Sequence, residues 1–166
     1  STDGGYVMAG YTNSFGFGLN DMYIVKLSNS NTLQWSRTFG GSNNDGANSI
    51  IQTTDGGYAV AGYTRSYGTV NGDIFIVKMN NIGLPLWSKS FGFANYGNYA
   101  LSIVQTADGG YAVAGDYYFG LITSNMYILK LDASGLFQWS RLIGGTVDDP
   151  ASSIIRTTDG RYKGAA

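Results

Sequence analysis

Short runs of apolar, β-branched and aromatic residues follow one another along the chain, separated by clusters of Gly, Asn, Asp and Ser. In the middle of the chain these runs occupy residues 48–52, 58–64, 73–79 and 86–91. No long stretch has apolar residues recurring roughly every three to four positions, as an amphipathic helix requires. The pattern therefore predicts an all-β protein made of short strands and tight turns.

The chain is built from a repeated sequence unit. One five-residue segment centred on Asp-Gly occurs four times, at residues 2–6, 54–58, 107–111 and 158–162. Two single residues recur with a spacing of 52 positions: Trp35, Trp87 and Trp139, and Lys26, Lys78 and Lys130. Independent markers that share one period identify a repeat of about 52 residues.

Each unit contains four strand-like runs, and an Asp-Gly turn links the first two. Asp-Gly supplies the positive φ that a tight hairpin needs. Four antiparallel strands in about 52 residues are typical of one β-propeller blade. We predict three such repeats: residues 1–46, which lack the first strand, residues 47–98, and residues 99–149, with the first strand of a further or shared blade in residues 150–166.

The second unit also carries a resemblance to a known family. The residues that carry it are Gly-Tyr-Ala-Val-Ala-Gly-Tyr-Thr at 57–64, Asp-Ile-Phe-Ile-Val-Lys at 73–78, Leu-Trp-Ser at 86–88 and Phe-Gly at 91–92. These segments resemble the bacterial and archaeal β-propeller repeat of large secreted surface proteins. The resemblance implies a β-propeller fold and a location outside the cell or on its surface, and it implies no particular activity.

The two ends of the repeat array do not match each other. Closed propellers typically use four to eight blades, and this chain has three repeat lengths. We expect an open array in which Ser153, Ile154, Ile155 and Arg156 form an unpaired assembly strand. That strand completes the first blade of another copy, giving a ring or a filament, or the missing blades belong to the same natural polypeptide. A self-closed body of three blades is the third alternative. Because the chain begins at Ser1 rather than Met, we expect it to be a processed or excised piece.

Composition excludes several classes of protein. His, Cys and Glu are absent, so neither a His-dependent catalytic relay nor a thiolate site can form. Ten basic and eleven acidic residues give a net charge of −1, which argues against nucleic acid as a partner. No apolar run is long enough to predict membrane insertion. The sequence contains neither a phosphate-binding loop nor the acidic spacing of a calcium loop, so we expect no cofactor and no metal.

One face of the predicted repeats carries candidate ligand-binding residues. The loops between second and third strands, and those between units, emerge on the same side and differ from unit to unit. Their aromatic and acidic residues suit sugar rings or a protein surface: Tyr67, Tyr96, Asp116, Tyr117, Tyr118, Asp148 and Asp149. Packing of loop against loop is the alternative reading. Asp116 with Asp148 or Asp149 would form the carboxylate pair of a glycosidase.

The recurrent Trp and Lys residues have structural explanations. Each Trp is expected to pack between neighbouring blades. Each Lys extends along apolar surface, pairs with a turn Asp, or guards a strand edge. The sequence as a whole predicts a non-catalytic extracellular structural or interaction module that assembles with itself or with missing blades. The alternative is a carbohydrate-binding or carbohydrate-active propeller.

Overall fold

The computed structural model describes residues 1–92, 96–119 and 123–157, and the backbone of residues 162–165. Its regular elements are thirteen strands. They are β1 (Tyr6–Thr12), β2 (Asp21–Leu27), β3 (Leu33–Phe39), β4 (Asp45–Gln52), β5 (Tyr58–Thr64), β6 (Asp73–Met79), β7 (Pro85–Phe91), β8 (Asn98–Gln105), β9 (Tyr111–Tyr118), β10 (Ser124–Leu131), β11 (Phe137–Ile143), β12 (Ser153–Arg156) and β13 (Tyr162–Ala165). In these residues there is no helix of the length and apolarity that a membrane span needs.

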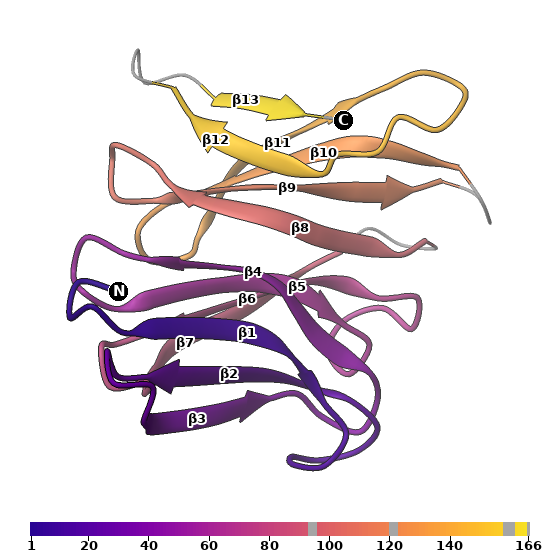
Figure 1. The fold of residues 1–166 in the computed structure, drawn as a ribbon. Coiled ribbons are helices and arrows are strands. Elements are labelled where there is room, and N and C mark those ends of the chain that lie inside the picture. Colours follow the sequence, from indigo (N-terminus) through magenta and orange to yellow (C-terminus); the bar gives the residue numbers. More distant parts are fainter. Residues whose placement is uncertain (93–95, 120–122, 158–161, 166) are drawn as a thin grey trace.

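The strands form antiparallel sheets in chain order, which confirms the all-β prediction. The first sheet has the order β1-β2-β3, the second β4-β5-β6-β7 and the third β11-β10-β9-β8. Strands β12 and β13 form a separate two-stranded sheet. The sheets follow one another through the molecule (Figure 1), because each strand is joined to its sheet neighbour by a short turn.

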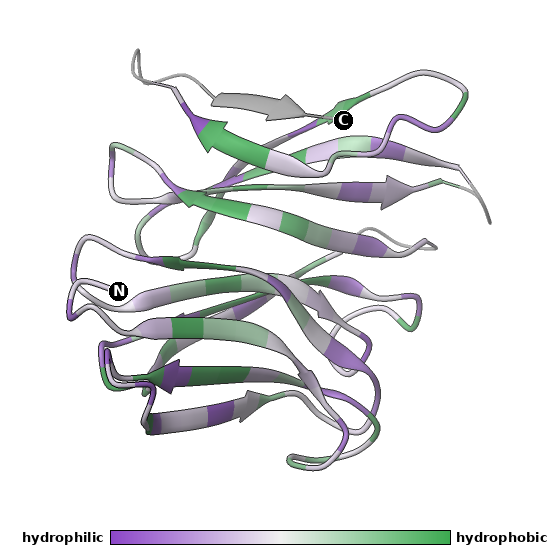
Figure 2. Cartoon of the chain, in the orientation of Figure 1, coloured by the Kyte–Doolittle hydropathy of each residue, from purple (hydrophilic) through white to green (hydrophobic). Residues whose placement is uncertain are grey.

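Neighbouring sheets bury apolar residues against each other. Between the first and second sheets, Ile24 of β2 packs with Val60 and Val77 of the second sheet. Between the second and third sheets, Ile76 packs with Leu129. Figure 2 shows hydrophobic residues along these strands and hydrophilic residues in many connecting loops. Strand β6 of the second sheet is therefore buried on both faces along its whole length.

The recurrent Trp residues lie between sheets, as predicted. The Trp35 ring meets Tyr58 of the next sheet edge to face, with ring centroids 5.7 Å apart. Trp87 meets Tyr111 in the same way at 5.6 Å. Trp139, the third member of the series, is 44% exposed. The same contact between sheets is thus made twice. Trp139 occupies the equivalent place in the third sheet.

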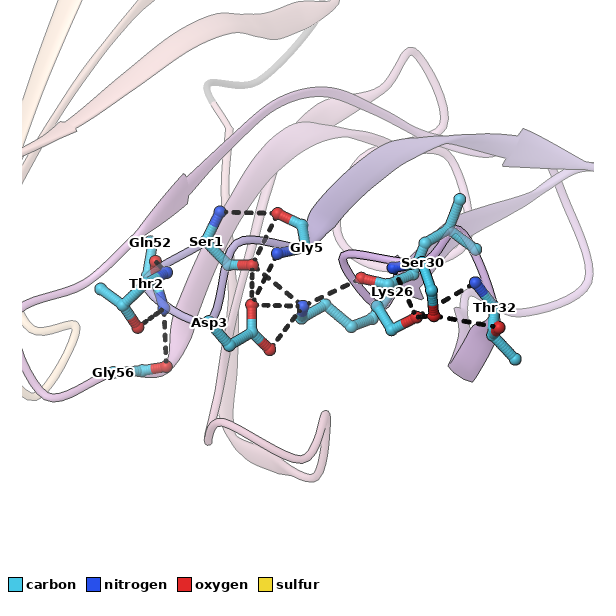
Figure 3. Close-up of polar contacts among 11 residues, drawn as sticks. Ser1, Thr2, Asp3, Gly5, Lys26, Ser30, Thr32, Gln52 and Gly56 are labelled. Carbon is cyan, nitrogen blue, oxygen red and sulfur yellow. Dashed lines mark hydrogen bonds and ion pairs between the residues drawn. The ribbon is translucent and has the colours of Figure 1, made fainter.

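The recurrent Lys residues pair with the Asp-Gly turns, which confirms one of the alternatives left open above. Lys26, which is 2% exposed, contacts the Asp3 carboxylate at 2.9 Å and donates to the Leu27 carbonyl (Figure 3). The same ion pair joins Lys78 to Asp55 and Lys130 to Asp108, each at 2.8 Å. The fourth Asp-Gly turn, predicted at Asp159, lies outside the described residues. These turns are structural elements of the repeat.

Acid should weaken this repeated ion pair. Although burial alone would raise it, the hydrogen bonds from Lys78 and Thr53 lower the pKa of Asp55 to about 2. An unfolded Asp has a pKa of about 3.9, so the Asp55 contribution to stability is full above that value and is lost as pH falls through about 2. We expect Asp55→Asn to lower the free energy of unfolding at pH 7 by about 1–2 kcal/mol and to reduce its fall between about pH 4 and 2, measured by urea unfolding.

The matched control for this prediction is Asp132→Asn. The Asp132 carboxylate accepts hydrogen bonds from the backbone N–H groups of Ser134 and Leu136, and has no ion-pair partner among the described residues. Asn80 already fills the same role in the second sheet, where its side-chain oxygen accepts hydrogen bonds from the N–H groups of Ile82 and Leu84. An equal loss of stability in both variants would contradict a specific role for the ion pair.

Candidate functional site

Loops from neighbouring sheets pack together on one side of the molecule, at the right in Figure 1. The N–H of Arg65 donates to the Asn44 carbonyl at 2.9 Å, and the N–H of Tyr118 donates to the Gly97 carbonyl at 3.1 Å. In both cases a loop leading into a sheet is bonded to the second-to-third-strand segment of that same sheet. These two contacts are of the loop-packing kind, which is one of the two alternatives left open from the sequence.

A row of tyrosines lies on this side between the second and third sheets. The Tyr99 ring meets Tyr63 at a centroid distance of 5.4 Å and Tyr118 at 5.7 Å, both edge to face. The Tyr99 hydroxyl accepts a hydrogen bond from Arg65 at 3.1 Å. That bond raises the pKa of Arg65, whereas burial raises the pKa of Tyr63 and of Tyr118. Tyr118 was a candidate from the sequence, but the row itself was not predicted, because it depends on the packing of two sheets.

The acidic candidates are held by backbone hydrogen bonds. Asp116, which is 9% exposed, accepts from the Ala151 N–H at 3.0 Å. Asp148 accepts from the Ser124 N–H at 2.7 Å, and Asp149 accepts from the Gly145 N–H at 2.7 Å. Burial raises the pKa of Asp116, and the nearby charge of Asp148 adds to the rise. The structure thus brings Asp116 and Asp148 into one neighbourhood, each carboxylate serving to position a loop.

The remaining aromatic candidates do not join that group. Tyr67 is 44% exposed, and its hydroxyl donates to the Gly40 carbonyl at 2.6 Å, next to the first and second sheets. Tyr117 packs against the core between the second and third sheets. Tyr96 is 39% exposed, and its carbonyl accepts from the Asn98 side chain. The predicted ligand residues are therefore spread over several places in the part of the chain that the structure describes.

The open edge of the first sheet is a second candidate site. Strand β1 lies at that edge, and its described pairing is with β2 alone. In the other two sheets a first strand pairs there with a bulge, β4 against β5 and β8 against β9. The free N–H and C=O groups of β1 form a row that can accept one more strand.

A glycine marks where that additional strand would pass. Gly62 and Gly115 hold equivalent places in the second strands, and a Cβ there would clash with the Gly46 and Tyr99 carbonyl oxygens of the first strands. Gly10 holds the same place in β1, yet a Cβ on it would meet nothing within 4 Å among the described residues. Glycine weakens a strand by about 0.5–1 kcal/mol relative to alanine. Gly10 therefore serves no purpose within its own sheet.

The strand predicted to assemble has a partner in the structure, which differs from the expectation that it is unpaired. Strand β12 pairs with β13 in the register Ser153↔Ala165, Ile154↔Gly164, Ile155↔Lys163 and Arg156↔Tyr162. The chain turns back after Arg156, so a hairpin satisfies one edge of β12. Ile154 is buried against Ala112 and Ala114 of the third sheet, whereas Ile155 is 59% exposed.

The Tyr and Trp residues that meet between sheets have exposed counterparts in the first and third sheets. On the first sheet, Tyr6 is 59% and Met8 49% exposed, although their counterparts Tyr58 and Val60 are buried. On the third sheet, Trp139 lines a cavity of about 530 Å³ with Ile128 of β10 and with Ser140, Arg141 and Ile143 of β11. Exposed apolar surface of this kind is a candidate binding face.

The described residues contain no group of three or more His, Cys, Asp or Glu side chains that would hold a metal ion.

No family model matches the chain, and a search of curated proteins finds no match. Among solved structures, the chain is similar to a protein of unknown function from Bacteroides caccae, whose crystal structure was determined at 1.35 Å resolution. The TM-score is 0.61 at 15% sequence identity, and the match covers 96% of this chain and 50% of that protein. The chain therefore spans half the length of this neighbour, and the likeness concerns the fold alone.

Proposed function

We propose that the chain is a non-catalytic structural and interaction module of the β-propeller type, acting outside the cell or at its surface. Its open edge and end faces are completed by further strands of the same kind. The proposal is supported by the stacking of repeated antiparallel sheets through one recurring contact. The composition, with few charges and many Gly and Tyr, is consistent with it.

Gly10 is the observation that carries the proposal. Strand β1 keeps a glycine at the place where the other sheets need one to admit a bulged first strand. The segment preceding and including β12 has the matching sequence, because Ala151 and Ser153 correspond to Ala47 and Ser49 at the bulge of β4. A segment like β12 therefore suits the free edge of β1 in sequence and in shape.

Two sources of that strand agree with these features: a second copy of the chain, and further repeats of a longer polypeptide. Asn31 lies at the turn where the Trp of either source would dock. Its counterparts Gly83 and Gly135 lie under Trp35 and Trp87, and a Cβ at either glycine would be 2.9 Å from the Trp ring. Asn31 carries a Cβ at the same turn, with φ of 61°. Docking of Trp139 from a second copy therefore requires a small shift, and Asn31→Gly should strengthen self-association.

The test is the mass of the chain in solution, combined with binding of a peptide that spans residues 147–157. We expect the peptide to bind the wild type and to fail to bind Gly10→Ala, because the added Cβ obstructs the incoming strand. Leu86→Ala is the matched control, since Leu86 is 56% exposed on β7, away from the open edge. Binding is measured by fluorescence anisotropy, and mass by light scattering.

The measured mass and the peptide binding together distinguish the two sources of the strand. A mass above 17.7 kDa that falls to the monomer in Gly10→Ala identifies a second copy as the source. A monomer that binds the peptide identifies further repeats as the source. A monomer that binds no peptide, or a Gly10→Ala variant that binds it as the wild type does, overturns the proposal.

Carbohydrate binding on the loop face is the second candidate function. It is favoured by the row of Tyr63, Tyr99 and Tyr118 beside the buried carboxylate of Asp116. Aromatic rings next to hydrogen-bonding groups suit sugar rings. A glycan array screened with the intact chain separates the two functions, since the open-edge proposal requires no glycan.

A further inference from the structure

Two buried carboxylates lie side by side where the first sheet meets the second. Asp21 begins β2 and is 3% exposed, and Asp45 begins β4 and is 0% exposed. The Asp45 N–H donates to the Asn20 carbonyl at 2.7 Å, which holds the two strand starts together. Burial raises the pKa of Asp21, and the negative charge of Asp45 raises it further. The negative charges of the two carboxylates are therefore close enough to repel each other.

Oxygen atoms from both carboxylates face the same point. A Cβ built on Gly40 would overlap Asp21 Oδ1 and would lie 2.7 Å from Asp45 Oδ2. The two oxygens therefore lie close together against the backbone of Gly40, which has no side chain to separate them. A cation placed between them would contact both carboxylates.

Each carboxylate has one oxygen with a partner and one without. Asp21 Oδ2 accepts from the Phe17 N–H at 2.5 Å, and Asp45 Oδ2 accepts from the Gly41 N–H at 2.9 Å and the Ser66 hydroxyl at 2.6 Å. Asp21 Oδ1 and Asp45 Oδ1 are buried and make no hydrogen bond. Within the described residues, the ion pairs are those of the Asp-Gly turns, so no cationic side chain neutralises this pair.

The equivalent places in the other repeats carry one charge instead of two. They are Asp73 with Asn98 and Asn125 with Asp149. The amide oxygens of Asn98 and Asn125 are also buried without a partner. A water molecule can satisfy a neutral amide oxygen. Two adjacent buried carboxylates need positive charge as well.

The site is reached through a cavity of about 250 Å³ that Asp21 and Gly40 line. Thr38, Ser88 and Tyr67, each of which carries a hydroxyl group, line the same cavity. Hydroxyl, carboxylate and water oxygens are the ligands that hard cations prefer. The cavity also admits the waters that complete the coordination of such an ion.

We propose that Asp21 and Asp45 bind a hard divalent cation at this point, and that Ca²⁺ is the ion that fits best. Ca²⁺ accepts irregular arrangements of oxygen ligands and waters, whereas Mg²⁺ requires a near-ideal octahedron. A shared proton is the competing way to neutralise the pair. The cavity beside Asp21, which has room for an ion and its waters, favours the cation.

The test is thermal unfolding of the full chain after treatment with a chelator, with and without added Ca²⁺ at pH 7. We expect saturating Ca²⁺ to raise the unfolding temperature of the wild type by at least about 5 °C, and Mg²⁺ to raise it less. Asp21→Asn and Asp45→Asn should lose the response. Without Ca²⁺, Asp21→Asn should unfold at a higher temperature than the wild type, because the repulsion is gone.

Asp73→Asn and Asp149→Asn are the matched controls, since each removes the single carboxylate of an equivalent place and should keep the Ca²⁺ response. Luminescence of bound Tb³⁺, sensitised by nearby tyrosine, gives a second readout that should disappear in Asp21→Asn. A wild type that ignores Ca²⁺ but gains stability as pH falls to about 5 would identify a shared proton and overturn the proposal. Equal responses in Asp21→Asn and Asp73→Asn would overturn it too.

Discussion

Gly115→Ala is expected to destabilise the chain by about 3 kcal/mol or more. A Cβ at Gly115 would clash with the Tyr99 carbonyl oxygen, a backbone atom of the neighbouring strand β8. Because β8 is packed between two sheets, it cannot retreat without opening the core around Ala100 and Ile103. Overpacking against fixed backbone typically costs about 1–3 kcal/mol and occasionally more. The free energy of unfolding in urea measures the effect.

Gly10→Ala is the control for this prediction. It makes the same chemical change at the same place in the repeat, where a Cβ meets nothing. We expect its free energy of unfolding to stay within about 0.5 kcal/mol of the wild type, or to rise slightly, because alanine restricts the unfolded chain. A large loss in Gly10→Ala would show that the edge of β1 is already occupied.

Trp87→Ala is expected to cost about 3 kcal/mol. The Trp87 ring packs on Tyr111, covers the turn at Gly135 and borders the core between the second and third sheets. Truncation removes an aromatic contact and leaves a cavity that the sheets cannot close. Urea unfolding followed by tryptophan fluorescence and, independently, by circular dichroism measures the loss.

Trp139→Ala provides the comparison within the same chain. Trp139 occupies the equivalent place but is 44% exposed, so its truncation should cost less than about 1 kcal/mol. If the two variants lose equal stability, Trp139 is covered as Trp87 is, and the end face of the third sheet is not available to a partner.

Part of the candidate site could be read from the sequence. The spacing of Trp35 and Trp87 predicted packing between sheets, and pairing with a turn Asp was one of three explanations left open for the recurrent lysines. The row of tyrosines around Tyr99 was not predictable, because its members come from different sheets. Gly10 carried a signal that sequence reasoning passed over, since its alignment with Gly62 and Gly115 has meaning only when the missing strand is known.

The sequence by itself determined the repeated pattern of four antiparallel strands and the Trp contact that joins one sheet to the next, whereas strand β13 and its pairing with β12 were not predicted. These features depend on short-range turns and on a repeated pattern of apolar residues, both of which are local properties of the chain. Tertiary structure decided which oxygens of Asp21 and Asp45 converge, and which faces of the first and third sheets stay open. Those results depend on how distant segments approach each other, and the pattern of residues along a strand does not encode that approach.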